Sequence, residues 1–312
     1  MKVIFIDSVH PILQEELERL GCQCDEFSHL SHQEIIALLP QYQGAVIRSK
    51  FLFDKETLDL ASKLKWIARS GAGMENIDVT YAESKGIKCF NSPEGNRDAV
   101  AEQAIGMLLM LFNNLKTADA EIRAGIWERE GNRGLEIKGK TVGIIGFGVM
   151  GEAFAQRLKG FNCKVIAYDK YNPNFEVDGV ESVSMKELQA QSDIVSLHFN
   201  YLPENLHFFN KEVIDGFKKD IYVINTSRGK NLSIKDISEA IKLGKIKGAC
   251  LDVLEFEASS FESLDFFSLP EEMKFILESD QVILSPHIAG WTKESYFKLS
   301  SFLAQKIKQN FF

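Results

Sequence analysis

Three side chains that together suit carboxylate binding and proton transfer each follow a short β-type segment late in the chain: they are Arg228, Glu257 and His287. Ligands of open parallel sheets bind beyond the carboxyl ends of the strands, so we expect these side chains to lie close together. Arginine offers a planar fork to a carboxylate, histidine exchanges a proton near neutral pH, and a glutamate beside it favours the imidazolium. Singly, they have ordinary explanations as a surface ion pair, a solvated carboxylate and a structural histidine. Together they predict a site that binds a carboxylate and moves a proton.

A glycine-rich loop earlier in the chain predicts where a cofactor binds. The loop Gly146-Phe-Gly-Val-Met-Gly151 follows a β-type run and opens a helical pattern, and Asp169 ends the next β-type run. Alone, such a loop is also typical of a simple glycine-rich turn, but this context favours dinucleotide binding. The helix N-terminus suits the pyrophosphate and Asp169 suits the ribose hydroxyls, and its charge would repel the 2′-phosphate of NADP. The predicted NAD-binding residues here are Gly146, Gly148, Val149, Met150, Gly151 and Asp169.

The composition indicates a soluble, folded chain without a basic surface. The 312 residues predict about two domains, and 36 basic against 44 acidic residues give a net charge of -8, which argues against nucleic-acid binding. The longest apolar run, residues 104–112, is shorter than the roughly 20 residues that a membrane span needs, and Asp7 interrupts the only run that could begin a signal peptide. The five cysteines predict reduced thiols and no metal site. We therefore expect a cytoplasmic protein.

Short β-type runs alternate with helical patterns, which predicts an α/β fold with parallel sheets covered on both faces. Between two such series, residues 99–115 are apolar on all sides and predict a helix that is buried all round. Ser184, Asn210 and Ser233 predict helix starts, and Gly244 predicts a helix end. The expected strands are residues 3–7, 45–48, 66–69 and 88–90 in the first series, and 141–146, 164–169, 193–198, 221–225, 247–253 and 282–285 in the second.

Several motifs in a fixed order resemble the D-isomer-specific 2-hydroxyacid dehydrogenase family over the whole chain, and within it the 3-phosphoglycerate dehydrogenase branch. Besides the glycine loop, the motifs are Arg69-Ser-Gly-Ala-Gly-Met-Glu-Asn-Ile-Asp78, Asn91-Ser-Pro93, Asn96 with Val100-Ala-Glu102, Ser227-Arg228-Gly229, Leu251-Asp252-Val253 and Pro286-His287. The resemblance implies two doubly wound parallel-sheet domains. A Rossmann NAD-binding domain, residues 97–288, would be inserted into a flavodoxin-like substrate-binding domain, residues 1–96 and 289–312.

The resemblance also implies an activity, the NAD-dependent transfer of hydride between a D-2-hydroxy acid and its 2-keto acid. Arg228 would bind the carboxylate and the C2 oxygen, His287 would exchange the hydroxyl proton, and Glu257 would support His287. Asp252 would bind the nicotinamide amide. The implied substrate is 3-phosphoglycerate or 3-phosphohydroxypyruvate, in serine biosynthesis, bound by a homodimer or higher homo-oligomer. The expected substrate-binding residues are Arg48, Arg69, Ser70, Gly71, Ala72, Gly73 and Arg129, of which the arginines would hold the phosphate and Arg129 would reach a neighbouring subunit.

Other interpretations remain open at this stage. The three arginines could instead form surface ion pairs, and the chain would then be a glyoxylate or hydroxypyruvate reductase or a general 2-ketoacid reductase. A non-catalytic, NAD-sensing corepressor on the same fold is a further alternative. The long segment between Glu257 and His287, with Phe261, Phe266 and Phe267, could be a lid or an oligomer contact. Because the chain stops soon after the last helix, we expect no C-terminal regulatory domain.

Overall fold

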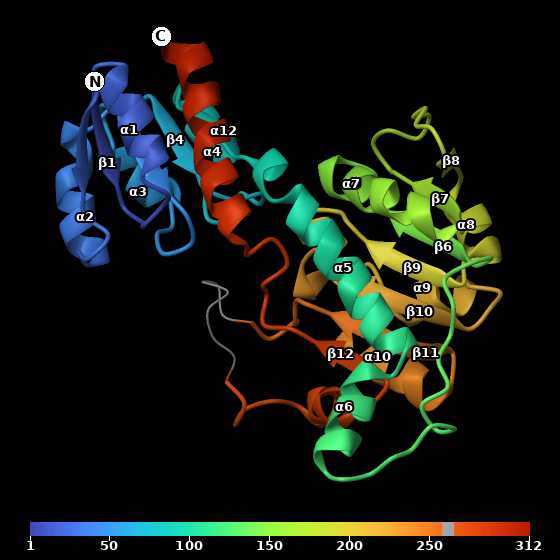
Figure 1. Cartoon of the computed structure of the whole chain (residues 1–312). Helices are drawn as coiled ribbons and strands as arrows, with labels where there is room; N and C mark the ends of the chain where they lie inside the picture. The colour runs from blue at the N-terminus through green and yellow to red at the C-terminus, as the bar shows by residue number, and fades with distance from the viewer. Residues whose placement is uncertain (258–264) are drawn as a thin grey trace. The chain divides into compact units, whose positions relative to one another are not determined.

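The computed structural model describes residues 1–257 and 265–312, so Phe261, part of the predicted lid or oligomer contact, lies outside the described residues. The described chain divides into two compact units, residues 1–97 with 290–312 and residues 98–289. Each unit contains one parallel β-sheet with helices on both faces (Figure 1). The predicted α/β fold with two doubly wound parallel sheets is therefore confirmed.

The first unit has a five-stranded sheet of order β2-β1-β3-β4-β5, in which every strand pairing is parallel. This is the strand order of flavodoxin-like folds. Its strands are β1 (Lys2–Phe5), β2 (Gln23–Glu26), β3 (Gly44–Ile47), β4 (Trp66–Arg69) and β5 (Lys88–Phe90). Its helices are α1 (Ile12–Arg19), α2 (His32–Leu38), α3 (Lys55–Leu60), α4 (Val79–Ser84) and α12 (Lys293–Phe311), with short 3₁₀ turns η1 (Leu39–Gln41) and η2 (Pro93–Gly95).

Successive residues of each central strand in the first unit point to opposite faces of the sheet. Ile4 joins the core under α2, α3 and α4, whereas Val3 and Phe5 join the core under α1 and α12. Leu303 and Ile307 of α12 are fully buried in that second core. The last helix of the chain thus completes a domain that the first 97 residues begin.

The second unit has a seven-stranded sheet of order β12-β11-β10-β9-β6-β7-β8, again with parallel pairing throughout. Counted from β6, this is the 3-2-1-4-5-6 order of Rossmann folds with a further strand at the β12 edge. Its strands are β6 (Thr141–Ile145), β7 (Lys164–Tyr168), β8 (Glu181–Ser182), β9 (Ile194–Leu197), β10 (Ile221–Asn225), β11 (Ile246–Leu251) and β12 (Val282–Leu284). Its helices are α5 (Arg97–Phe112), α6 (Leu115–Arg123), α7 (Val149–Leu158), α8 (Met185–Gln191), α9 (Lys211–Gly216), α10 (Ile234–Lys242) and α11 (Glu271–Glu278), with η3 (Lys159–Phe161), η4 (Pro203–Asn205) and η5 (Gly229–Asn231).

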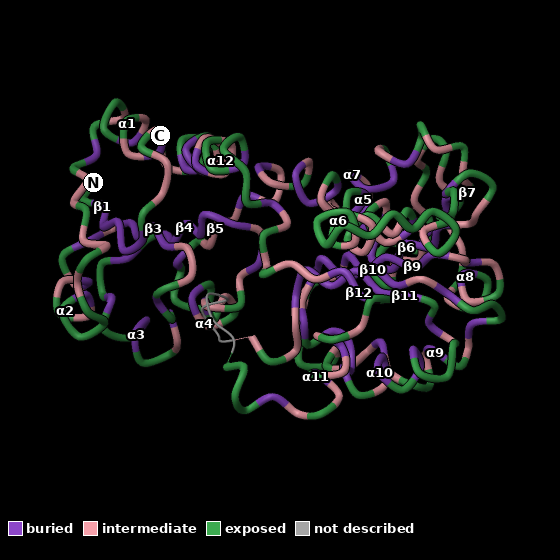
Figure 2. The backbone as a smooth tube through the Cα atoms, turned by 60° about the horizontal axis from the view of Figure 1, so that its bottom comes forward, coloured by how far each residue is buried: buried purple, intermediate pink, exposed green. Residues whose placement is uncertain are grey.

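Helices cover both faces of the seven-stranded sheet. Residues of α5 and α7 pack on one face, and residues of α8, α9, α10 and α11 pack on the other. Buried residues accordingly follow the strands in the interior of each unit (Figure 2). No helix of the described residues is long and apolar enough to cross a membrane. All five cysteines, each of which is described, are free thiols.

Local sequence signals predicted several elements well and the long apolar helix less well. Ser184, Asn210 and Ser233 each cap a helix through the side chain, and Gly244 takes a left-handed conformation after α10, as predicted. The expected helix over residues 99–115 ends at Phe112, because Asn114 adopts a left-handed conformation. The prediction that this helix is buried on all sides is wrong, because Met110 is exposed. A helix on a sheet buries mainly the face that it turns to the strands.

His198 is a buried histidine just after β9. Its Nε2 lies 2.7 Å from Ser196 Oγ, its ring packs 5.0 Å from that of Phe154, and burial lowers its pKa from the usual range to about 3. The folded chain therefore binds fewer protons at His198 than the unfolded chain, so the stability gained from the neutral ring is complete above about pH 6.5 and is lost as the pH falls toward 3.

We predict that the free energy of unfolding falls by up to about 1.4 kcal/mol per pH unit below about pH 6.5 because of His198. In His198→Gln, which keeps a partner for Ser196 but cannot be protonated, this part of the slope should disappear. Urea unfolding at several pH values measures the slope. His29→Gln, at an exposed histidine, is the matched control. An unchanged slope in His198→Gln would show that the ring is not the responsible group.

Candidate active site

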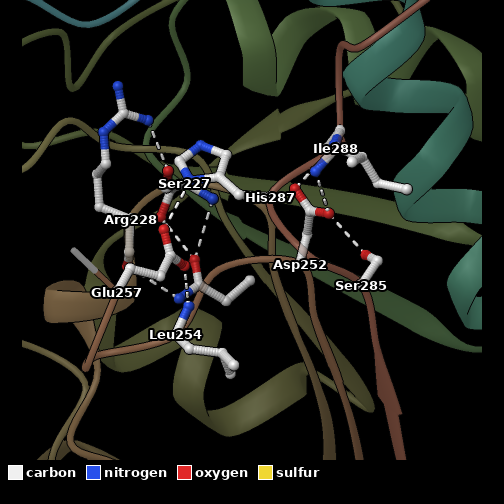
Figure 3. Close-up of polar contacts among 10 residues, drawn as sticks. Ser227, Arg228, Asp252, Leu254, Glu257, Ser285, His287 and Ile288 are labelled. Atoms are coloured by element: carbon white, nitrogen blue, oxygen red, sulfur yellow. Dashed lines mark hydrogen bonds and ion pairs between the residues drawn. The ribbon is translucent and has the colours of Figure 1, made fainter. Parts of the chain in front are cut away.

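Three neighbouring strands carry the predicted catalytic side chains. β10, β11 and β12 are adjacent in the sheet, with Asn225 paired with Leu251 and Leu251 paired with Leu284 at their carboxyl ends. Arg228, Glu257 and His287 follow these three ends in the same order. Figure 3 shows the loops that carry them, with the His287 ring turned toward Glu257.

The central contact is a hydrogen-bonded pair between Glu257 and His287. His287 Nδ1 lies 2.7 Å from Glu257 Oε2, and the two side chains are only 21% and 14% exposed. The backbone N–H of Leu254 donates to the other carboxylate oxygen, so Glu257 is held from its own turn. A carboxylate on Nδ1 fixes the ring orientation and directs Nε2 away from Glu257. The pair is therefore arranged to transfer a proton through Nε2.

His287 has a backbone conformation that is rare for residues other than glycine, with φ of 54°. Its N–H donates to Asp252 O at 2.7 Å. Beside it, the buried Asp252 carboxylate accepts hydrogen bonds from Ser285 Oγ at 2.6 Å and from the N–H groups of Ile288 and Ala289, both at 2.9 Å. Asp252 was predicted from the sequence to contact the cofactor amide. In the structure, its carboxylate fixes the loop that presents His287 (Figure 3).

Arg228 is held by a second tight loop next to the Glu257 turn. Asn225 Nδ2 donates to Arg228 O at 3.0 Å, and Arg228 Nη1 donates to Ser227 O at 2.7 Å. At Gly229, a Cβ atom would lie 2.0 Å from Leu254 O, so only glycine fits there. This close approach brings the backbone that carries Arg228 against the turn that ends in Glu257.

The predicted dinucleotide loop has the geometry that pyrophosphate binding needs. Gly146 has a φ of 90°, and a Cβ on Gly151 would lie 2.3 Å from Gly146 O, whereas nothing lies within 4 Å of a Cβ on Gly148. Gly148 begins α7 without a side-chain cap, and Val149 and Met150 form the first turn, where backbone N–H groups point outward. The open side of this loop therefore offers donors to an anion.

Two further features of the second unit fit a bound NAD. Asp169 follows β7 and accepts from Phe147 N at 2.7 Å and from two backbone N–H groups of its own loop, which leaves one of the roughly four acceptor positions of a carboxylate for a ribose hydroxyl. Thr226 Oγ1, beyond β10, is buried and makes no hydrogen bond within the described residues. A buried hydroxyl of this kind suits a polar group of a ligand. The residues present thus fit the cofactor.

The predicted substrate-binding arginines Arg48 and Arg69 are neighbours at the carboxyl ends of β3 and β4 in the first unit. Arg69 Nε donates to Arg48 O at 3.0 Å, and the Arg48 N–H donates to the carboxylate of Asp7 at 2.5 Å. The Arg48 guanidinium carbon lies 4.6 Å from the ring centre of Trp291. A Cβ on Gly71 would meet Arg69 Nη1 at 2.4 Å, so glycine leaves room for that guanidinium.

The remaining substrate-binding candidates lie in two places. Ser70, Ala72 and Gly73 share the loop after β4, where Asn91 Nδ2 donates to Ala72 O at 2.5 Å. Arg129 belongs to the second unit and is exposed in the segment between α6 and β6. The structure thus brings Arg48, Arg69 and the Ser70–Gly73 loop together within the first unit.

Comparison with known families identifies the second unit. A family model described as D-isomer specific 2-hydroxyacid dehydrogenase, NAD binding domain, matches residues 105–289. The chain belongs to the D-isomer specific 2-hydroxyacid dehydrogenase family. The family that the motifs predict is therefore confirmed, and so is NAD as the class of cofactor for the Rossmann-type unit.

Relatives of this 2-hydroxyacid dehydrogenase family member act on different molecules. It is similar to the D-3-phosphoglycerate dehydrogenase of Archaeoglobus fulgidus, 32% identical over 309 residues, which cover 98% of this chain and 56% of that relative. It is also similar to the hydroxypyruvate reductase of Thermotoga maritima, 34% identical over 279 residues, which cover 89% of this chain and 88% of that relative. A solved acyclic imino acid reductase in complex with NADPH and D-Arg has a TM-score of 0.87 and 25% identity and covers 99% of this chain and 97% of its own. The chain thus spans about half the length of the first relative.

The sequence analysis of this family member missed residues whose contacts are with residues far away in the sequence. Trp291 follows the histidine motif by a few residues, and its stacking on Arg48 carries no local signal. Ser285 entered the sequence analysis only as the last residue of the expected strand 282–285, yet its hydroxyl donates a hydrogen bond to Asp252. Glu255 lies two residues before Glu257 and was not singled out. The spacing of such residues in the sequence does not indicate which of them are in contact until the strand order is known.

The hydrogen bonds of Asp252 lead to a stability prediction for this dehydrogenase fold. Asp252→Asn places an NH₂ group against at least one backbone N–H, which should lower the free energy of unfolding by about 2–4 kcal/mol. Ser285→Ala removes one donor and leaves the carboxylate on its two backbone partners, at a cost of about 1 kcal/mol. Urea denaturation near pH 7 measures both values. Equal losses in the two variants would contradict the role given to the carboxylate.

Proposed function

We propose that the protein is an NAD-dependent oxidoreductase that transfers a hydride between a D-2-hydroxy acid and its 2-keto acid. The observation that carries the proposal is the 2.7 Å Glu257–His287 pair. Glu257 follows β11, which lies between β10, the strand before Arg228, and β12, the strand before His287. Membership of the family and the fit of the glycine loop to NAD support it. NAD, when bound, supplies the hydride acceptor or donor.

The roles of the side chains follow from their chemistry. Arg228 would bind the substrate carboxylate and the C2 oxygen through a planar fork that lysine lacks. His287 would take the hydroxyl proton during oxidation through Nε2 and return it during reduction. Glu257, on Nδ1, would fix the ring and stabilise the imidazolium by its negative charge. The backbone N–H groups of Gly71 and Gly73 would support the carboxylate.

We further propose 3-phosphoglycerate and 3-phosphohydroxypyruvate as the physiological pair. Support comes from the neighbouring Arg48 and Arg69 at the carboxyl edge of the first sheet, which gather positive charge in a chain of net charge -8. A phosphate of nearly two negative charges requires such local donors. The similarity to the Archaeoglobus enzyme points to the same pair. In this proposal Arg129 completes the phosphate site from a neighbouring subunit.

A second candidate is a glyoxylate or hydroxypyruvate reductase. One observation favours it: the indole of Trp291 lies 4.6 Å from the Arg48 guanidinium carbon and covers one face of that group. A stacked guanidinium keeps its edges for hydrogen bonds but loses one direction of approach. The Thermotoga hydroxypyruvate reductase, which this chain covers over 88% of its length, is consistent with this alternative.

We also propose that the protein is cytoplasmic and forms a homodimer or a higher homo-oligomer. Large apolar side chains are exposed along α6 and the segment after it, and Trp127 is 80% exposed there. Such a group of side chains is typical of an interface between copies. The exposed members are Leu115, Ile122, Ile126 and Trp127. Their position beside Arg129 supports a contribution of this segment to a neighbouring subunit.

The proposed reaction is tested with His287→Asn, which removes the titratable ring and keeps a polar side chain of similar size. General acid–base catalysis typically contributes about 10²–10⁴-fold, so kcat should fall by that factor with every 2-keto acid. NADH consumption by purified protein measures it. Binding of NADH without turnover by the wild type would favour the corepressor alternative, and a near wild-type kcat in the variant would place proton transfer elsewhere.

The substrate is tested by comparing Arg48→Ala and Arg129→Ala on substrates with and without a phosphate. A sheltered charge-assisted contact is worth about 1.5–3 kcal/mol, so kcat/KM for 3-phosphohydroxypyruvate should fall about ten- to a hundredfold. The same variants should leave hydroxypyruvate and glyoxylate unaffected. Arg228→Gln is the matched control, because it should impair all three substrates. Equal losses on phosphorylated and unphosphorylated substrates would support the reductase instead.

A further inference from the structure

A second glutamate–histidine pair lies in the second unit, and its glutamate, Glu255, stands two residues before Glu257 in the sequence. His207 Nε2 lies 2.6 Å from Glu255 Oε1. The Glu255 side chain is only 18% exposed, and that of His207 is 38% exposed. Neither residue takes part in the chemistry proposed above. A contact of this length is a well-formed hydrogen bond, and its carboxylate side is largely sheltered from solvent.

The other oxygen of Glu255 ties the pair to a helix. Glu255 Oε2 accepts the backbone N–H of Ile234, the first residue of α10, at 3.0 Å. The N-terminus of a helix offers unpaired backbone N–H groups, and the Glu255 carboxylate accepts one of them. One carboxylate therefore joins three segments that are distant in the sequence: the loop after β9, the start of α10 and the turn after β11.

The turn after β11 is the one that presents Glu257. Glu257 N donates to Leu254 O at 3.2 Å, and Leu254 N donates back to the Glu257 carboxylate, so residues 254–257 form one closed turn. Glu255 lies within this turn, and its carboxylate forms the hydrogen bonds to His207 and to the first residue of α10. A shift of Glu255 would therefore move the Glu257 carboxylate relative to His287.

The His207 side of the pair is itself fixed against the loop that carries Arg228. His207 N donates to Lys230 O at 2.8 Å, and Phe209 N donates to Asn231 O at 2.9 Å. His207 adopts a left-handed backbone conformation with φ of 50°, which turns the chain at this point. The segment around His207 thus runs along η5, which begins directly after Arg228. The pair thus connects two of the three loops that hold the proposed catalytic groups, those of Arg228 and Glu257.

We propose that Glu255 and His207 form a positioning pair that sets the Glu257 carboxylate on His287 Nδ1. This inference rests on the proposed function in one respect, the catalytic role that it gives to Glu257 and His287. Glu255 and His207 touch neither reacting atom, so they act through the turn of residues 254–257. Loss of the pair lets Glu257 move from His287, and the imidazolium then loses part of its stabilisation.

The variants are Glu255→Gln, which keeps the shape but removes the charge, and His207→Asn, which tolerates the left-handed backbone but is too short to reach Glu255. In both, kcat for 2-keto acid reduction should fall about tenfold or more, since a misplacement of about 1 Å can cost up to about a hundredfold. KM should change less than about twofold. Glu239→Gln, at an exposed position of α10, is the matched control and should behave as the wild type.

The pH profile separates positioning from a merely structural role. Reduction requires the imidazolium, so weaker stabilisation should move the alkaline limb of the kcat profile to lower pH in both variants. A lowered melting temperature with an unchanged pH profile would overturn the proposal. The NMR resonance of the His287 Nδ1–H proton provides a test without turnover, and it should move upfield in both variants because the hydrogen bond to Glu257 weakens. If the wild type shows no turnover, the proposed function fails, and the NMR shift alone decides the positioning role.

Discussion

The buried carboxylate of Asp252 is the constraint on which the proposed catalytic histidine depends. It is 1% exposed and accepts hydrogen bonds from three donors in the loop after β12, and the N–H of His287 binds the backbone oxygen of the same residue. Charge-assisted hydrogen bonds in a protein interior are strong and directional. They hold His287 in a left-handed conformation that a free loop would rarely adopt. Contacts within the chain itself therefore align the imidazole with Glu257.

A carboxylate that accepts several backbone N–H groups also follows two other strands. Asp7, after β1, accepts backbone N–H groups of residues 48–50, and Asp169, after β7, accepts those of Phe147, Tyr171 and Asn172. In each case a carboxylate binds the backbone of a loop at the carboxyl edge of a parallel sheet. Loops are otherwise the most mobile parts of a fold. These carboxylates thus give the ligand-binding edge of each sheet a defined shape.

The two sheets contribute different chemistry to the proposed reaction. The second unit carries the acid–base pair Glu257–His287 and the glycine loop, and the first carries Arg48 and Arg69. In the proposed function, the first unit would select the side chain of the 2-hydroxy acid, and the second would carry the groups for hydride and proton transfer. The stack of Trp291 on Arg48 bears on that selection, because it alters the directions from which an anion can approach Arg48.

The sequence by itself determined the features that depend on near neighbours. The strands at residues 66–69 and 221–225, the helix start at Ser184 with its partner Glu187, and the turn at Gly146 all follow from local propensity and spacing, so they could be predicted. The short edge strands β2 and β8 were not, because edge positions carry weak hydrophobic patterns. Only the tertiary structure decided the partners of Asp252 and the link from Glu255 to His207. These contacts join residues more than 30 positions apart, and their geometry depends on strand order and register, which one sequence does not specify.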